Sequence, residues 1–392
     1  MVPDADQMVR FSVSGQASIV GVDNGQQESD EIYKYGETES GRYSERTAYH
    51  GKVLVIIKSE KTAGDAVLTI SANDLKPAQV AFRVTEDGSG SAPAAPVVNG
   101  TETSAEQVAI TAPQGKRVTL PSAVRVHYTS SAGDYSLMRK VTWGTMTNNR
   151  AKGTIEGCKL EAAAVITEDA NMQLDQELAT NTALSGNSSI FRLKDLKGEA
   201  ADKALATATF TGNQQNYPNN MLDGNESTSW TNAYERGESV LLPANKRSRK
   251  SDTVTFYWND RKVMNRIALH FKENAYCAVP SVLKAEYWNG EDWAVAPGQV
   301  VQKNEQGLAE IQFLPVYTDK VRVYMENGTP FTEKGNIEII EASVMLSSAK
   351  MDPQIIMDPL VSVQQGGKVS IGVQMANMPE DKTVSELSFA LA

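Results

Sequence analysis

Residues 52–85 read KVLVIIKSEKTAGDAVLTISANDLKPAQVAFRVT and contain three short runs that are rich in β-branched residues. The runs are KVLVIIKS (52–59), AVLTISA (66–72) and QVAFRVT (79–85), and turn-forming Gly, Pro, Asn and Asp residues separate them. The same texture returns between residues 117 and 143 and between residues 253 and 325, and no long stretch has the 3.6-residue period of a helix. Short strands that recur about every ten residues predict an all-β chain of sandwiches or barrels.

The composition of the chain limits its size class and its partners. A length of 392 residues suits roughly two to four domains, and a hydrophobic share of 41% suits packed cores. The formal net charge is −10. Phosphate groups and anionic lipid surfaces attract basic faces, so we expect neither nucleic acid nor an anionic membrane as a partner.

The remaining global signals concern membranes, ends and metals. The sequence contains no run of 18 or more apolar residues, so it predicts no segment that spans a membrane. The N-terminal MVPDADQMVRFSVSG lacks the basic and apolar regions of a signal peptide, and SELSFALA ends the chain inside an apparent strand, so we expect a fragment. Cys158 and Cys277 are expected to be buried thiols. The three histidines are too scattered to predict a His-based metal site or a Ser-His-Asp triad.

Polar, aperiodic stretches divide the chain into strand-rich parts. TEDGSGSAPAAP (85–96) is rich in Gly, Ser and Pro, and a second polar stretch begins near Glu168. The predicted layout is a domain at 1–87, a linker at 88–96, a domain at 97–168, a linker at 169–203, a domain at 204–346, and the truncated start of a further β module at 347–392.

The first domain carries GVDNG (21–25), AYHGKVLVII (48–57) and LTISANDLKPAQV (68–80). These motifs closely resemble the immunoglobulin-like domain that follows the catalytic barrel in long bacterial family 2 glycoside hydrolases, mainly β-galactosidases. The resemblance implies that a catalytic module covalently precedes this chain in its parent and that the parent is secreted or lies on the cell surface. Asp23 is interpreted as a turn former. Glu28, Asp30 and Glu31 are expected to form a solvated loop face.

The second domain contains LPSAVRVHYTSSAGDYSLMRKVTW (120–143), which resembles a bacterial immunoglobulin-like repeat. Such repeats serve as spacers. The third domain contains LDGNESTSW (222–230), YWNGEDWAV (287–295), TDKVRV (318–323) and IIEASV (339–344). The order of these motifs is similar to the discoidin-like fold, also called the factor V/VIII C-type domain, which includes many galactose-binding modules. The fold prediction is therefore tandem immunoglobulin-like sandwiches followed by a discoidin-like jelly-roll sandwich.

The run LDGNESTSW offers many oxygen atoms within a few residues. Ca²⁺ prefers six to eight oxygen ligands, and the carboxylate of Asp223, backbone carbonyls near Asn225 and the hydroxyl of Thr228 could supply several. The resemblance adds Glu341 from the last strand as a remote ligand of a structural ion. The alternative is an Asp-Gly-Asn turn that its own hydrogen bonds hold, without an ion. Trp230 is expected to pack in the core.

A carbohydrate ligand would contact the loops at one end of the third sandwich. A sugar site needs planar polar groups for the hydroxyls and an aromatic platform, within a shallow depression. The candidate residues are Asn232, Tyr234, Arg236, Glu273, Asn274, Tyr276 and Phe331. The His and Arg pair of the galactose-binding pattern has no clear match in this sequence.

Three functional hypotheses follow. The first is a non-catalytic C-terminal region of a secreted bacterial glycoside hydrolase, of the β-galactosidase type, which binds a galactoside or a complex glycan. The second is that the chain hydrolyses glycosides itself, which the absence of an αβ barrel pattern disfavours. The third is a purely architectural or adhesive array of β modules that binds no sugar.

Overall fold

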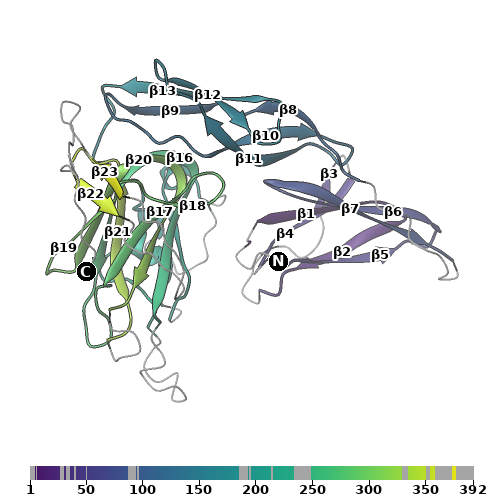
Figure 1. The fold of residues 1–392 in the computed structure, drawn as a ribbon. Helices are drawn as coiled ribbons and strands as arrows, with labels where there is room; N and C mark the ends of the chain where they lie inside the picture. Colours follow the sequence, from purple (N-terminus) through teal and green to yellow (C-terminus); the bar gives the residue numbers. More distant parts are fainter. Residues whose placement is uncertain are drawn as a thin grey trace, which may run out of the picture. The chain divides into compact units, whose positions relative to one another are not determined.

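The computed structural model describes most of the chain, namely residues 5, 7–26, 31, 36–38, 41–49, 51–86, 94, 97–184, 193, 196–212, 215–233, 249–328, 334–349, 354–357 and 373–376. Within these residues the regular elements are β-strands and short 3-10 helices (Figure 1). The prediction of an all-β chain is confirmed. In the same ranges, no helix has the length and the apolar character that crossing a bilayer takes.

The first domain is a sandwich of two antiparallel sheets. Its strands are β1 (Met8–Gly15), β2 (Ala17–Asp23), β3 (Gly36–Thr38), β4 (Gly41–Thr47), β5 (Leu54–Ser59), β6 (Gly64–Ala72) and β7 (Leu75–Val84). One sheet has the order β3-β4-β1-β6-β7, and β2 pairs with β5 in the other. Phe11 and Leu68 of the larger sheet and Ile19 and Val22 of the smaller one form the core between them. Alternating apolar residues bring the two inner faces together.

The sequence Asp23-Asn24-Gly25 forms the turn that was predicted at this position. The carboxylate of Asp23 accepts hydrogen bonds from the backbone N–H groups of Asn24, at 2.7 Å, and of Gly25, at 3.2 Å. Gly25 has a φ of 77°, which lies in the left-handed region that glycine adopts without steric cost. The interpretation of Asp23 as a turn former is confirmed.

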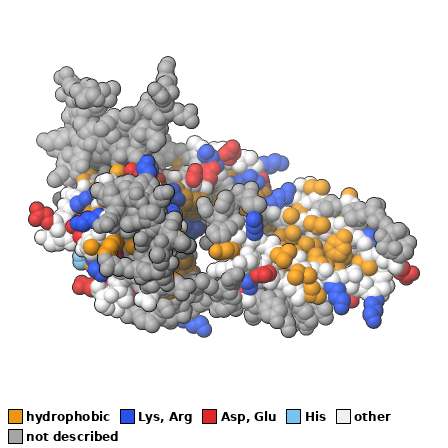
Figure 2. Space-filling model, turned by 90° about the horizontal axis from the view of Figure 1, so that it is seen from below, with side chains coloured by type: hydrophobic (Ala, Val, Ile, Leu, Met, Phe, Trp, Pro, Cys, Tyr) orange, Lys and Arg blue, Asp and Glu red, His pale blue; other side chains and the backbone are white. Residues whose placement is uncertain are grey.

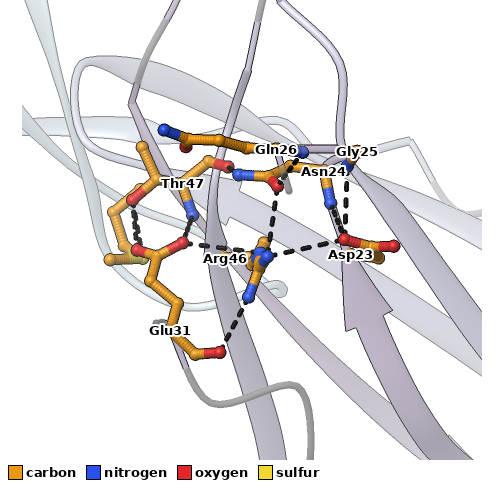
Figure 3. A network of polar contacts seen from close by, with 8 residues as sticks. Asp23, Asn24, Gly25, Gln26, Glu31, Arg46 and Thr47 are labelled. Atoms are coloured by element: carbon orange, nitrogen blue, oxygen red, sulfur yellow. Dashed lines mark hydrogen bonds and ion pairs between the residues drawn. The ribbon is translucent and has the colours of Figure 1, made fainter. Parts of the chain in front are cut away.

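A buried polar network lies beside this turn (Figure 3). Arg46 of β4 is 4% exposed, and its guanidinium donates to the backbone carbonyl of Glu31, at 2.8 Å, and to Oδ1 of Asn24, at 3.2 Å. The Glu31 carboxylate lies 3.5 Å from Nε of Arg46 and accepts from the backbone N–H of Thr47 at 3.1 Å. Its side chain is only 9% exposed. The expected solvated role is therefore wrong for Glu31, while Glu28 and Asp30 lie outside the described residues.

The second domain contributes another antiparallel sheet. Its strands are β8 (Thr101–Ala105), β9 (Val108–Pro113), β10 (Ala123–Thr129), β11 (Tyr135–Trp143), β12 (Arg150–Ile155) and β13 (Glu161–Asp169), and they follow the order β8-β10-β11-β12-β13-β9. The first residues of β11 pair with β10, and its last residues pair with β12. One long strand thus joins the two halves of the sheet.

The third domain is built around two long strands. Its strands are β14 (Leu205–Ala208), β15 (Trp230–Thr231), β16 (Ser251–Phe271), β17 (Val282–Trp288), β18 (Trp293–Val295), β19 (Val300–Lys303), β20 (Leu308–Glu326) and β21 (Glu338–Met345). TVTFYW (253–258) and RIALHF (266–271), which read as two separate strand-like runs in the sequence, lie in the single strand β16. AEIQFL and KVRVYM likewise merge into β20.

Shifts in register divide β16 and β20 into halves, and each half belongs to a different layer of the sandwich. The pairing of β16 with β20 shifts between Tyr257 and Lys262 and again between Met264 and Arg266. Before the shifts β16 pairs with β14, and after them it pairs with β21. β20 pairs with β19 in its first half and with β17 in its second half. Bulges bend strands in this way, so β16 and β20 build both layers of a sandwich.

The stretch before the third domain adds to its core. Ala179, Leu184 and Leu196 are buried in the same cluster as Phe256 and Phe313. The short helices η1 (Thr182–Leu184), η3 (Gly198–Asp202) and η4 (Pro218–Leu222) lie in and after this stretch. Residues that were expected to form a linker at 169–203 thus contribute packing to the domain that follows them. Farther on, β22 (Gln354–Met357) pairs with β23 (Val373–Ala376).

We expect the variant Arg46→Ala to destabilise the first domain by about 3–5 kcal/mol, because the Glu31 carboxylate would stay buried without its partner. Urea unfolding of the purified chain measures this loss. Arg83→Ala is the matched control, since Arg83 forms an ion pair with Asp65 in which both side chains are about half exposed. That pair is screened by water, so the control should unfold like the wild type. Equal losses in both variants would contradict the role of the buried network.

Candidate functional site

A tight turn after η4 places the oxygen atoms of the run LDGNESTSW close together. Gly224 has a φ of 73°, and Oδ1 of Asp223 accepts from the backbone N–H of Asn225 at 2.9 Å. The Thr228 hydroxyl lies 3.0 and 2.9 Å from the two carboxylate oxygens of Asp223 and 2.8 Å from the carbonyl oxygen of Asn225. The backbone N–H groups of Asn225 and Thr228 and the Thr228 hydroxyl supply one proton to each of these three acceptor oxygens, and each oxygen keeps a further lone pair.

A second carboxylate reaches this turn from the last strand of the domain. Oε1 of Glu341, on β21, is buried and has no hydrogen-bond partner among the described residues. Burial, and then the charge of Asp223, raise the pKa of Glu341 to about 7, while the backbone N–H of Asn225 lowers it. The structure therefore brings together all four residues that were predicted to hold an ion: Asp223, Asn225, Thr228 and Glu341.

The chemistry of this oxygen cluster suits a hard cation. Two of the groups are carboxylates, and the others are a backbone carbonyl and a hydroxyl, which are the ligands that Ca²⁺ prefers. In the described part of the chain, no three His, Cys, Asp or Glu side chains cluster closely enough to hold a metal by themselves.

Trp230 closes the run and belongs to the core, as predicted. Its side chain is fully buried, and Nε1 donates to the carbonyl oxygen of Phe210 at 3.2 Å. It pairs with Ile339 of β21, which ties the turn to the last strand. The indole ring is therefore not available to stack on a ligand.

The structure describes four of the seven residues that were predicted to bind a sugar. Asn232 is fully buried, with Nδ2 donating to Asp252 and Oδ1 accepting from the backbone N–H of Ile337. Its amide supports the inside of the loop and does not reach the surface. Glu273 is exposed and Tyr276 is half-buried. Tyr234, Arg236 and Phe331 lie outside the described residues.

Asn274 belongs to a polar cluster whose other members were not predicted from the sequence. Glu338, at the start of β21, accepts from Ser229 Oγ at 2.8 Å and from Lys272 Nζ at 3.0 Å through Oε1, and from Asn274 Nδ2 at 2.8 Å through Oε2. The Lys272 side chain is 53% exposed. We call Ser229, Lys272, Asn274 and Glu338 the loop-end cluster. Charged residues directly after RIALHF and directly before IIEASV were the available sequence signal for Lys272 and Glu338.

The Asn274 loop is held in one shape by its own side chain. Oδ1 of Asn274 accepts from the backbone N–H groups of Tyr276, at 2.8 Å, and Cys277, at 2.9 Å. Cys277 is buried, as expected, and its burial raises the pKa of the thiol to about 11. Cys158, which was also expected to be buried, is half-buried. The loop thus presents Glu273 and Tyr276 from a fixed base, beside Lys272.

Comparison with known proteins identifies the first domain. Residues 1–81 match Glycoside hydrolase family 2 C-terminal domain 5. The β-galactosidase BoGH2A of Bacteroides ovatus is 38% identical over 78 residues, which are 20% of this chain and 8% of that protein. The chain therefore spans less than a tenth of the curated relative that it matches. The resemblance that the motifs of residues 21–80 indicated is confirmed for this domain.

Comparison with solved structures gives matches to part of the chain. One solved chain from the β-galactosidase BgaA of Streptococcus pneumoniae has 18% sequence identity, and the match covers 37% of this chain and 98% of that chain with a TM-score of 0.29. The family 32 carbohydrate-binding module of NanJ from C. perfringens, solved with galactose, has 15% identity, covers 36% of this chain and 93% of its own, and has a TM-score of 0.28.

We expect the stability of the ion-free third domain to fall as the pH rises from about 4.5 to about 7. Glu341 keeps its proton to a higher pH in the folded chain, with a pKa of about 7, than its usual value of 4.5. The folded state therefore binds more protons in this window, and proton binding stabilises it. Because the group is only half buried, the effect should amount to about 1–2 kcal/mol.

Thermal unfolding in the presence of a chelator, at pH 5 and pH 8, measures this effect. The wild type should unfold at the lower temperature at pH 8, and Glu341→Gln should remove most of the difference. Glu273→Gln, a change at an exposed carboxylate, is the control and should keep it. A wild-type profile that is flat, or that rises with pH, would contradict the geometry around Glu341.

Proposed function

We propose that this chain is the non-catalytic C-terminal region of a secreted or cell-surface bacterial glycoside hydrolase of the β-galactosidase type. In this proposal the third domain binds a galactoside or a complex glycan and positions the enzyme on it. The observation that carries the proposal is the match of residues 1–81 to a C-terminal domain of glycoside hydrolase family 2. A domain of that kind follows other modules in its family, so a catalytic module would precede residue 1 in the parent.

The chain itself is proposed to be inactive toward glycosides. Retaining hydrolysis needs two carboxyl groups about 5–5.5 Å apart on either side of a sugar bond in a cleft. Glu341 and Asp223 do approach each other, but they meet at a turn where Oε1 of Glu341 is buried. Their proposed role is structural. The purified chain should therefore not turn over a nitrophenyl galactoside.

The proposed sugar site lies beside the loop-end cluster. Glu273 is exposed, Lys272 is half-exposed and Tyr276 is half-buried, and all three belong to a loop that Asn274 fixes through three hydrogen bonds. A carboxylate and an ammonium group can share the hydroxyls of a sugar as acceptor and donor. A tyrosine ring adds the apolar surface that sugar rings pack against. A prepared loop also limits the entropy that binding would cost.

A Ca²⁺ ion is proposed for the turn at Asp223. The residues fit the ion, because Glu341 has a buried, unbonded carboxylate oxygen among the described residues and the acceptor oxygens of the turn keep further lone pairs. Asp223, Glu341, the carbonyl of Asn225 and the hydroxyl of Thr228 would hold it. The ion would relieve the repulsion between the two carboxylates and fasten the start of the domain to its last strand.

One observation favours the architectural alternative. Asn232 is buried, and both Glu338 and Asn274 already bond to neighbours within the protein. Polar groups that are satisfied in this way gain less from a ligand than free ones. Under this alternative the third domain is a spacer with the fold of a binding module. Retention on immobilised sugars separates the two functions.

We expect the chain to be retained on a gel that carries galactosides, and Glu273→Gln to weaken this binding about 10-fold, which corresponds to about 1.4 kcal/mol. Glu291→Gln is the matched control. Glu291 is exposed in the hairpin between β17 and β18, at the far end of a strand of seven residues, so binding should not change. Affinity electrophoresis measures the three proteins side by side. A folded chain that no galactoside or complex glycan retains would leave only the architectural function.

We expect Ca²⁺ to raise the melting temperature of the third domain and EDTA to lower it. At 100 times its dissociation constant, a ligand of the folded state adds about 2.7 kcal/mol. Asp223→Ala should abolish the response to Ca²⁺, while Asp292→Ala, a change in an exposed hairpin, should keep it. Scanning calorimetry measures both. If neither Ca²⁺ nor EDTA moves the wild-type transition, the turn is held by its own hydrogen bonds.

A further inference from the structure

Strand β5 of the first domain carries apolar side chains on both faces. Val55 and Ile57 point inward and pack against the core of the sandwich. Leu54 and Ile56 point the other way and are 55% and 50% exposed. Val20, in the bulge of the paired strand β2, is 44% exposed. We call Val20, Leu54 and Ile56 the β2–β5 outer face.

Strand β1 of the other sheet shows a different pattern. In β1, Phe11 is buried and Val9 and Val13 pack against the core, while the alternating positions Arg10 and Ser14 are exposed. A strand with one face in water has apolar and polar residues in alternation along its sequence. A strand that is covered on both faces has a continuous run of apolar residues. The run LVII at the start of β5 is of the second kind. Its sequence suits a strand that is covered on both sides, and only one side is covered by this domain.

Hydrophobic side chains are exposed on the surface of the first domain. Figure 2 shows hydrophobic side chains gathered over the first domain, at the right of the view. Among the described residues, β2 and β5 pair only with each other. Apolar side chains and open strand edges on one surface favour association with another folded body.

We propose that the β2–β5 outer face docks onto the module that precedes this domain in the parent chain. This inference rests on the proposed function. Residues 1–81 match a C-terminal domain of glycoside hydrolase family 2, and the match covers only 8% of the related β-galactosidase. More than nine-tenths of that relative lies outside the match and could supply the surface that covers the patch.

The size of the patch favours a tethered occupant over a second copy of the chain. Separate proteins that associate stably bury about 1,600 Å², far more than three half-exposed side chains provide. A module on the same chain needs less surface, because a short connection holds it at an effective concentration in the millimolar range. Contacts between domains of one chain are accordingly smaller and less apolar than permanent interfaces.

Thiol labelling compares the patch in the chain of 392 residues and in the parent chain that carries the preceding module. Ile56→Cys reports the β2–β5 outer face. Leu75→Cys is the matched control, because Leu75 is also 50% exposed but lies in β7 of the other sheet. Both variants carry Cys158→Ser, so that the half-buried natural thiol does not contribute. The probe is a maleimide at neutral pH.

The thiol at position 56 should react at least 10-fold more slowly in the parent chain than in the chain of 392 residues, and the thiol at position 75 should react equally in both. Equal rates at position 56 would overturn the proposal. Slow reaction at position 56 in the chain of 392 residues would overturn it as well, because a surface other than the preceding module would then cover the patch.

The melting temperature of a second variant tests the same contact. Ile56→Lys should leave the melting temperature of the 392-residue chain unchanged and lower that of the parent, while Leu75→Lys should change neither. Hydrolysis of a galactoside by the parent tests the proposed function separately. Protection at position 56 in an inactive parent would support the docking and refute the enzyme, and an active parent without protection would do the reverse.

Discussion

Strands β16 and β20 stay paired with each other while they pass from one layer of the third domain to the other. The pairing runs from Ser251 with Glu326 to His270 with Leu308 and is interrupted only by irregular register near the middle. Every other strand of the sandwich attaches to this pair or to a strand that does. Because one half of β16 carries β14 and the other carries β21, the two shifts in register decide where the last strand lies. The oxygen-rich turn and the loop-end cluster both depend on that position.

Strand β21 positions both the oxygen-rich turn and the loop-end cluster. Glu338 at its start holds the loop-end cluster, and Glu341, three residues later, faces the turn at Asp223. Trp230 pairs with the residue that follows Glu338. An ion at the turn and a ligand at the loops would therefore act on the same short strand from two sides.

The sequence allowed more of the fold than of the site to be predicted. Alternating apolar runs and turn residues were enough for the all-β class, and the buried position of Trp230 followed from its place after a turn. The merging of short runs into β16 was not predictable, because a bulge has no strong signal in a single sequence. Asn232 appeared to be a surface amide because it lies in a polar loop, and its burial depends on Asp252, twenty residues away. The solvated role expected for Glu31 was wrong for the same reason, since its partner Arg46 lies on β4, fifteen residues away.

The segment that leads into the third domain lies beside the segment that leaves it. Asp175 donates its backbone N–H to Leu346 and accepts from Ser348, and Leu178 donates to Val344, in an antiparallel pairing. A force applied along the polypeptide would therefore act on both segments at the same end of this short antiparallel pairing. Such a load breaks the backbone hydrogen bonds of this pairing one after another, beginning at Asp175, before it acts on the other strands of the domain. Tension applied through residues 175 and 348 would therefore load this pairing before it loads the strands inside the third domain.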